Sequence, residues 1–155
     1  MSDEKSEVKR EEKSVDVSLV HGPVIYEDPP FYRHGGGENA FLGRTRHEES
    51  ATNGCLKLLN YEAKESMAIK MLQQIAQDAM DQHQLLFVRI RHSVGEVPVG
   101  DASVLVQVIG VHRRETFEAT AEIMDRLKKK VPIWKQEVWE SGTTWKDGTT
   151  VDPSA

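Results

Sequence analysis

The sequence has a single cysteine, Cys55, among its 155 residues. One cysteine excludes a disulfide framework within the chain and a zinc site built on several cysteines. The six histidines are scattered and form neither an HxxxH pair nor an HExxH motif, so the sequence predicts no metal site and no cofactor. No apolar run approaches the roughly 20 residues that a membrane helix needs, so we expect no membrane partner.

Basic residues are fewer than acidic ones. The chain has 20 lysines and arginines against 25 acidic residues, which gives a net charge of −5. A general nucleic-acid binder is normally basic, so we expect no nucleic-acid partner. The charged start of the chain has no apolar segment of the kind found in signal peptides, and we therefore expect a cytoplasmic location.

The length suits one globular domain with a substantial core. Residues 1–16 mix acidic and basic side chains and have almost no apolar ones, so they predict a disordered charged tail. We expect the domain over 17–146 and a flexible C-terminus over 147–155.

Apolar periodicity within the domain predicts two helices and several strands in mixed order, which indicates an α+β domain. One helix includes paired apolar residues between Met67 and Met80, and the other extends from about Glu115 to Lys130. The predicted strands cover 17–26, 40–46, 56–61, 85–91 and 103–111.

The second helix carries three lysines near its end and meets a proline. Pro132 lacks an N–H and clashes with the preceding turn, so the helix should end near Lys130. Lys128 and Lys135 would then come from different local structures and could converge on an anion or a carbonyl. The alternative is that these lysines are solvated and only complement the helix dipole, and composition alone favours it.

A second candidate site lies where the strand over 103–111 turns into the helix. His112 and Arg113 would stand beside the free N–H groups of the helix start and form an anion site. Alternatively, Arg113 and Arg114 merely decorate that start, although positive charge is unfavourable there.

Other features are weaker when taken alone. Arg44 and Arg46 share a strand face, but positive charges also occur on solvated edge strands. The glycines at 35–37 are not followed by the Lys-Ser or Lys-Thr pair of a phosphate loop, so a flexible turn is favoured. Cys55 fits plain packing better than a role as a persulfide carrier.

The order of these pieces resembles the large, catalytic subunits of molybdopterin synthases. The resemblance covers most of residues 36–146, and its last segment is the most specific. The matching segments are FLGRTR (41–46), LNYEAKESMA (59–68), RHSVGEVPVGDASVLVQV (91–108), VHRRETFEA (111–119) and MDRLKKKVPIWKQEVWESGTTWK (124–146).

The resemblance implies an α/β-hammerhead domain with an additional small antiparallel β-sheet. It also implies a homodimer of large subunits that binds two small ubiquitin-like sulfur-carrier subunits, giving a heterotetramer. The Gly-Gly C-terminus of each small subunit carries a thiocarboxylate. The implied enzyme is a sulfurtransferase of molybdenum cofactor biosynthesis, which delivers sulfur to cyclic pyranopterin monophosphate and forms the molybdopterin dithiolene.

Carried over motif by motif, the resemblance makes Lys128 and Lys135 the active-site lysines. It assigns Arg46, His112 and Arg113 to substrate binding. One alternative is a diverged, non-catalytic paralogue that binds a ubiquitin-like tail as a scaffold; another is an unrelated anion-binding domain. A pure tail binder would not need all five residues, which favours the enzyme. The sequence departs from the family pattern at Glu38, Asn39, Lys64 and Ser93, which bears on the dimer and the pocket rim.

Overall fold

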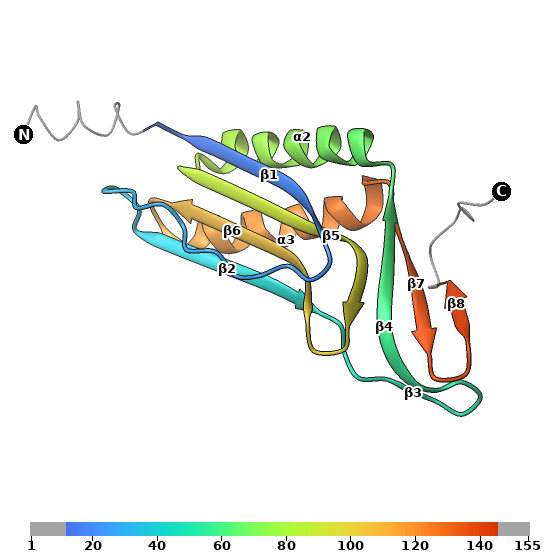
Figure 1. The fold of residues 1–155 in the computed structure, drawn as a ribbon. Coiled ribbons are helices and arrows are strands. Elements are labelled where there is room, and N and C mark those ends of the chain that lie inside the picture. The colour runs from blue at the N-terminus through green and yellow to red at the C-terminus, as the bar shows by residue number, and fades with distance from the viewer. Residues whose placement is uncertain (1–11, 146–155) are drawn as a thin grey trace, which may run out of the picture.

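Two helices lie against one face of a mixed β-sheet in the computed structural model, which describes residues 12–145 (Figure 1). Neither helix is long and apolar enough to cross a membrane. The elements in chain order are β1 (Ser14–His21), β2 (Gly37–Arg44), β3 (Glu49–Ser50), β4 (Gly54–Ala63), α2 (Glu65–His83), β5 (Phe87–Pro98), β6 (Ala102–Gly110), α3 (Arg113–Lys130), β7 (Ile133–Trp139) and β8 (Thr143–Trp145).

Strand β5 belongs to both parts of the sheet. Its first part, residues 87–92, pairs with β6, which in turn pairs with β2, while β1 runs parallel to β5 on the other side. Its second part pairs with β4, and β7 and β8 follow; β3 pairs with β4. The strands β4, β7 and β8 extend away from the helices (Figure 1). The predicted α+β class is confirmed, and these strands form the expected small antiparallel sheet.

The main core lies between the two helices and the first part of the sheet. Strand β6 is buried along its whole length because both of its faces are covered. The helices cover one face, and they do so through the regularly spaced apolar residues that the sequence predicts. The buried residues of this cluster include Ala68, Leu72, Ile75, Ala76, Ala79, Met80, Ile90, Val104, Val106, Val108, Ala119, Ile123 and Leu127.

The segment over 22–36 covers the other face of the sheet. Strand β1 ends at His21, earlier than the predicted Tyr26, because Gly22 has a φ of 90° and turns the chain across the sheet. Val24 then bridges to Ala102, and the Gln107 side chain donates a hydrogen bond to the Glu27 carbonyl. These contacts explain why an irregular segment is held firmly against the sheet.

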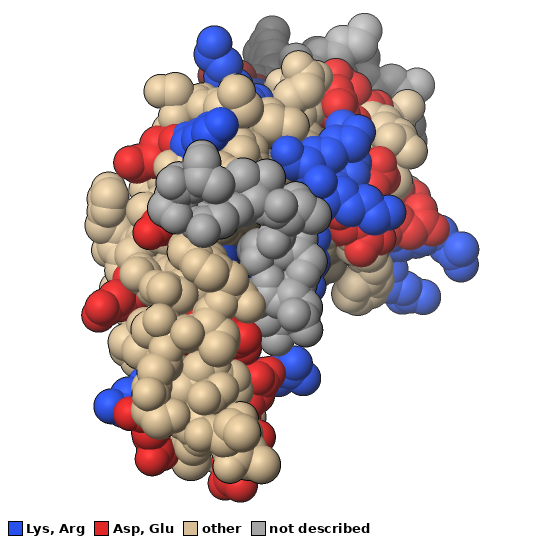
Figure 2. Space-filling model, turned by 90° about the vertical axis from the view of Figure 1, so that its right-hand side faces the viewer, with Lys and Arg blue, Asp and Glu red and all other residues tan. Residues whose placement is uncertain are grey.

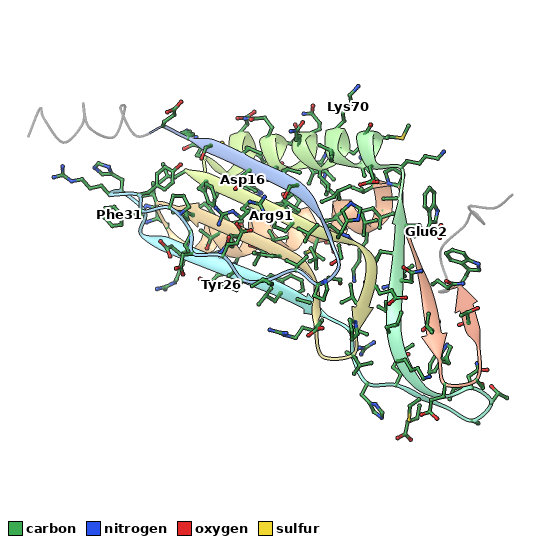
Figure 3. The ribbon with its side chains drawn as sticks, in the orientation of Figure 1. Asp16, Tyr26, Phe31, Glu62, Lys70 and Arg91 are labelled. Carbon is green, nitrogen blue, oxygen red and sulfur yellow. The ribbon has the colours of Figure 1, made fainter. Side chains whose placement is uncertain are left out.

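Strand β1 also begins earlier than the sequence indicates. The Asp16 carboxylate accepts hydrogen bonds from Arg89 and Arg91 at 2.9 and 2.8 Å, and Asp16 and Arg91 point toward one another in Figure 3. The two guanidinium groups, Arg91 first, hold the pKa of Asp16 below its ordinary value although burial opposes the shift. Residues 14–16 therefore form a strand, not part of the predicted 1–16 tail. Residues 1–11 and 146–155 lie outside the described residues.

Strand β2 starts at Gly37 and not at the predicted residue 40. Its polar beginning has partners, because the Asn39 side chain donates hydrogen bonds to the Thr116 carbonyl and the Thr120 hydroxyl of α3. A Cβ at Gly36 would lie 2.1 Å from the Val111 carbonyl oxygen, so only glycine allows this approach. The glycines at 35–37 therefore bring β2 close to the start of α3.

Candidate active site

The end of α3, the strands β4 and β7, and β5 at the point where it changes partners surround a pocket of about 510 Å³. We call it the lysine pocket. Both predicted active-site lysines line it, and Arg44, Lys129 and Trp134 lie among the other lining residues. Figure 2 faces the side of the molecule on which α3 ends, and lysine and arginine side chains gather there. Clustered positive charge attracts an anionic ligand.

Local chain geometry brings Lys128 and Lys135 together. Helix α3 ends at Lys130, as predicted, and the Val131 N–H closes its last turn on the Leu127 carbonyl. Pro132 prevents a further turn, and β7 begins at Ile133. Lys128 therefore lies on the last helical turn and Lys135 lies three residues into the strand that leaves it. The two lysines thus line the same pocket from different elements.

Three buried polar residues, Tyr61, His92 and Ser103, form part of the lining of the lysine pocket, and we call them its floor. Tyr61 of β4 donates a hydrogen bond to the Ser103 hydroxyl of β6 at 3.0 Å. The Tyr61 ring meets the His92 ring edge-on, with 5.1 Å between centroids and 80° between planes. Burial raises the pKa of Tyr61, so its hydroxyl stays protonated at neutral pH. The floor therefore adds no negative charge to compete with an anionic ligand.

His92 is neutral and has a defined tautomer. Its Nδ1 lies 2.9 Å from the Ser93 carbonyl oxygen, which can only accept, so Nδ1 carries the hydrogen. Burial lowers the pKa of His92 to about 4; the hydrogen bond to Ser93 opposes this shift, and the charge of Lys135 adds to it. The Nε2 atom of His92 is consequently an acceptor at neutral pH.

The buried His92 should make stability depend on pH. Its pKa is about 4 in the folded chain and near 6.5 in the unfolded one, so the unfolded state binds the extra proton between these values. The contribution of neutral His92 to the free energy of unfolding is therefore fully present above pH 6.5. It is lost as the pH falls toward 4, which lowers the free energy of unfolding by about 3 kcal/mol at most. Urea unfolding of wild type and His92→Gln across this window measures the effect. A variant as pH-sensitive as wild type would contradict it.

The other end of α3 forms a second, separate pocket of about 420 Å³, which we call the His112 pocket. His112, Arg113 and Arg114 line it together with Gly36. His112 occupies the N-cap position with extended backbone and makes no side-chain capping bond. The first N–H groups of α3 and the positive end of its dipole face this pocket, so it suits an anion.

The five predicted site residues do not converge within one chain. Arg113 and Lys128 lie at opposite ends of α3, about 22 Å apart along its axis. Arg46 lines neither pocket, and its side chain is 81% exposed and pairs with Glu48 at 3.6 Å. Within a single copy the predicted residues therefore do not share one pocket, because the length of α3 separates the two basic groups.

Several pocket residues were missed in the sequence. Tyr61, His92 and Ser103 lie in strands with ordinary β patterns, so only the pairing of distant strands reveals that they meet. Arg44 lines the lysine pocket and donates to the Gly100 carbonyl, although the family motif points to Arg46. Lys129 is exposed and also lines the pocket.

Cys55 lies away from both pockets. Its Sγ, His47 and Glu49 bring possible metal-ligand atoms within 4.8 Å of one another. Each has a protein partner, since His47 contacts Glu49 at 3.2 Å and the Cys55 thiol donates to the Glu140 carboxylate. This hydrogen bond raises the pKa of Cys55, which keeps the thiol protonated and weakly nucleophilic. The arrangement agrees with a structural cysteine.

Comparisons with known proteins bear on this site. A family model described as MoaE protein matches residues 12–130, which include Lys128 and end before Lys135. The molybdopterin synthase catalytic subunit of Pyrococcus abyssi is 42% identical over 73% of this chain and 75% of its own length. That of Bacillus subtilis is 37% identical over 73% and 71%. The crystal structure of molybdopterin synthase from Staphylococcus aureus matches with a TM-score of 0.75 and 30% identity, over 83% of this chain and 94% of that one.

Proposed function

Since this chain belongs to the MoaE protein family, we propose that it is the catalytic subunit of a molybdopterin synthase. In this function it transfers sulfur from the thiocarboxylated C-terminus of a small ubiquitin-like subunit to cyclic pyranopterin monophosphate. The observation that carries the proposal is the lysine pocket, in which Lys128 and Lys135 converge from a helix end and a strand. We also propose a cytoplasmic location, which suits the free thiol of Cys55.

The two lysines suit the two anions of the reaction. A thiocarboxylate and a phosphate both carry negative charge, and an ammonium is a compact charge with three donors. In this proposal Lys128 lies beside the terminal carbonyl of the tail and stabilises the charge that develops as sulfur leaves. Lys135 acts as the proton donor or acceptor, and its partly buried position in β7 suits that role.

A second copy of the chain completes the site in this proposal. His112 and Arg113 suit a phosphate, because an arginine can bind it with two parallel hydrogen bonds. They are too far from Lys128 within one chain to contact the same small molecule. A dimer removes this obstacle if the His112 pocket of one copy faces the lysine pocket of the other. Arg46, exposed on the β2–β3 connection, is then also available to the partner.

Exposed apolar side chains near the start of α3 support such an interface. Phe117 is 63% exposed and Val111 is 46% exposed, and Phe31 in the covering segment is 88% exposed. Exposing several large apolar side chains to water is unfavourable, and such groups are typical of surfaces through which proteins associate. A second copy that covers them would also bring His112 and Arg113 into a shared site.

Reconstitution tests the proposed function. The purified chain, a thiocarboxylated small subunit and cyclic pyranopterin monophosphate should together yield molybdopterin. The matched control is the same small subunit with an ordinary C-terminal carboxylate, which should yield none. A chain that binds the small subunit but forms no product would instead be the non-catalytic scaffold.

A further inference from the structure

His92 lies at the corner between the two parts of the sheet. It is the last residue of β5 that pairs with β6, opposite Val104, and Gly95 three residues later pairs with Tyr61 of β4. Only 6% of His92 is exposed, yet it lines the lysine pocket. A buried histidine in the wall of a reaction pocket is a candidate for a functional role.

The structure fixes the His92 ring on two sides. Its Nδ1–H is held by the Ser93 carbonyl, and the Tyr61 ring packs against it edge-on. Ser93 is itself fixed, because its buried hydroxyl donates to the Gly22 carbonyl at 2.7 Å. With the ring and the tautomer fixed, Nε2 can only accept a hydrogen bond.

Lys135 is a charged neighbour of this ring. It stands opposite Tyr61 in the pairing of β4 and β7, so Tyr61 is a shared neighbour of Lys135 and His92. The positive charge of Lys135 acts on the His92 ring. The other cations of the pocket, among them Lys128 and Arg44, are donors only, as Lys135 is. A hydrogen bond from one ammonium to the His92 acceptor would therefore distinguish that lysine from the rest.

We propose that His92 is a positioning residue whose Nε2 accepts a hydrogen bond from the Lys135 ammonium and thereby aims that ammonium at the reacting end of the small-subunit tail. The role in sulfur transfer rests on the proposed function, whereas the contact is inferred from the shared pocket and from the common neighbour Tyr61. Holding a reacting group in place is worth up to about 100-fold in rate.

Amide side chains can separate the two ring nitrogens. His92→Asn retains a donor near the Nδ1 position but has no atom at Nε2, while His92→Gln can place its amide oxygen near Nε2. We expect His92→Asn to lower kcat by about tenfold to 100-fold with KM changed less than about twofold. We expect His92→Gln to retain at least about a third of the wild-type kcat. Equal losses in both variants, or no loss in His92→Asn, would overturn the proposal.

A double-mutant cycle with Lys135 separates positioning from general damage to the pocket. If His92 acts through Lys135, then adding His92→Asn to Lys135→Ala should cost little beyond the single Lys135→Ala change. Independent, multiplying losses would show that His92 acts on something else and would overturn the proposal. The melting temperature of each variant identifies losses that come from unfolding.

A nitrogen NMR measurement tests the contact without any reaction. In the full chain labelled with ¹⁵N-histidine, the His92 Nε2 signal should be that of an unprotonated ring nitrogen and should move in Lys135→Met. An unchanged signal would overturn the proposal even in an active enzyme. Suppose that the His92 Nε2 signal moved in Lys135→Met but the wild-type chain formed no molybdopterin. The proposed function would then be wrong, while the contact between His92 and Lys135 would be supported.

Discussion

Replacement of Lys128 by alanine is expected to slow molybdopterin formation by about 100-fold or more. Lys128 lies on the last turn of α3 and lines the lysine pocket, where we place the carbonyl that loses its sulfur. Removal of one group that stabilises developing charge typically costs about 10²- to 10³-fold in rate. Single-turnover assays with a preloaded small subunit measure the chemical step directly.

The matched control for Lys128 is Lys130→Ala. Lys130 occupies the same helical turn, but its charge acts on Asp78 of α2 and it does not line the lysine pocket. Removal of that charge should leave the rate within about twofold of wild type, because an exposed charge pair contributes little. Equal losses in both variants would mean that the general charge of the helix end matters and not the position of Lys128.

Replacement of Arg113 by alanine is expected to raise the KM for cyclic pyranopterin monophosphate by about tenfold to 100-fold. The loss of a two-point contact with a phosphate costs about 1.5–3 kcal/mol, which corresponds to this range. Arg113 is well placed for such a contact, because it is the first residue of α3 and lines the His112 pocket beside the free backbone N–H groups of the helix start.

Arg113→Ala and Lys128→Ala should therefore change different kinetic constants. The first should act mainly on KM and the second mainly on kcat. Lys70→Ala is a suitable control, because Lys70 is an exposed cation of α2 outside both basic pockets. A KM for Arg113→Ala equal to that of wild type would remove the His112 pocket from the substrate site.

The end of α3 was predictable because its cause is local. Pro132 stops the helix within two residues, so the sequence indicates both the end at Lys130 and the divergence of Lys128 from Lys135. The paired apolar residues of α2 likewise follow from the helical period. Both features depend on residues close together in the chain.

Features that depend on distant partners were not predictable in this way. Asp16 resembles part of a charged tail, but it joins β1 because Arg89 and Arg91 of β5 lie beside it. Asn39 breaks an apolar pattern, yet α3 supplies its hydrogen-bond partners. His92 lies in a strand of ordinary pattern and becomes a pocket residue only when β4 and β6 pair on either side of it.

The family resemblance implies a reaction site that includes Arg46, His112 and Lys128, but it does not say which copy of the chain provides each of them. Arg46, His112 and Lys128 lie in segments whose order along the chain matches the family. The length of α3 then separates His112 from Lys128. Sequence order alone could not reveal this separation, because it depends on the helix being continuous from Arg113 to Lys130.

Mixed dimers test most directly whether two copies build the sulfur-transfer site. Lys128→Ala and Arg113→Ala chains, each with a different affinity tag, are co-expressed, and dimers that carry both tags are purified. If the site takes Lys128 from one copy and Arg113 from the other, then one of the two sites in each mixed dimer is intact. Assayed at a substrate concentration well below the raised KM of Arg113→Ala, at which each variant alone is strongly impaired, such dimers should form molybdopterin at about half the wild-type rate. Mixed dimers as impaired as their parents would contradict the shared site.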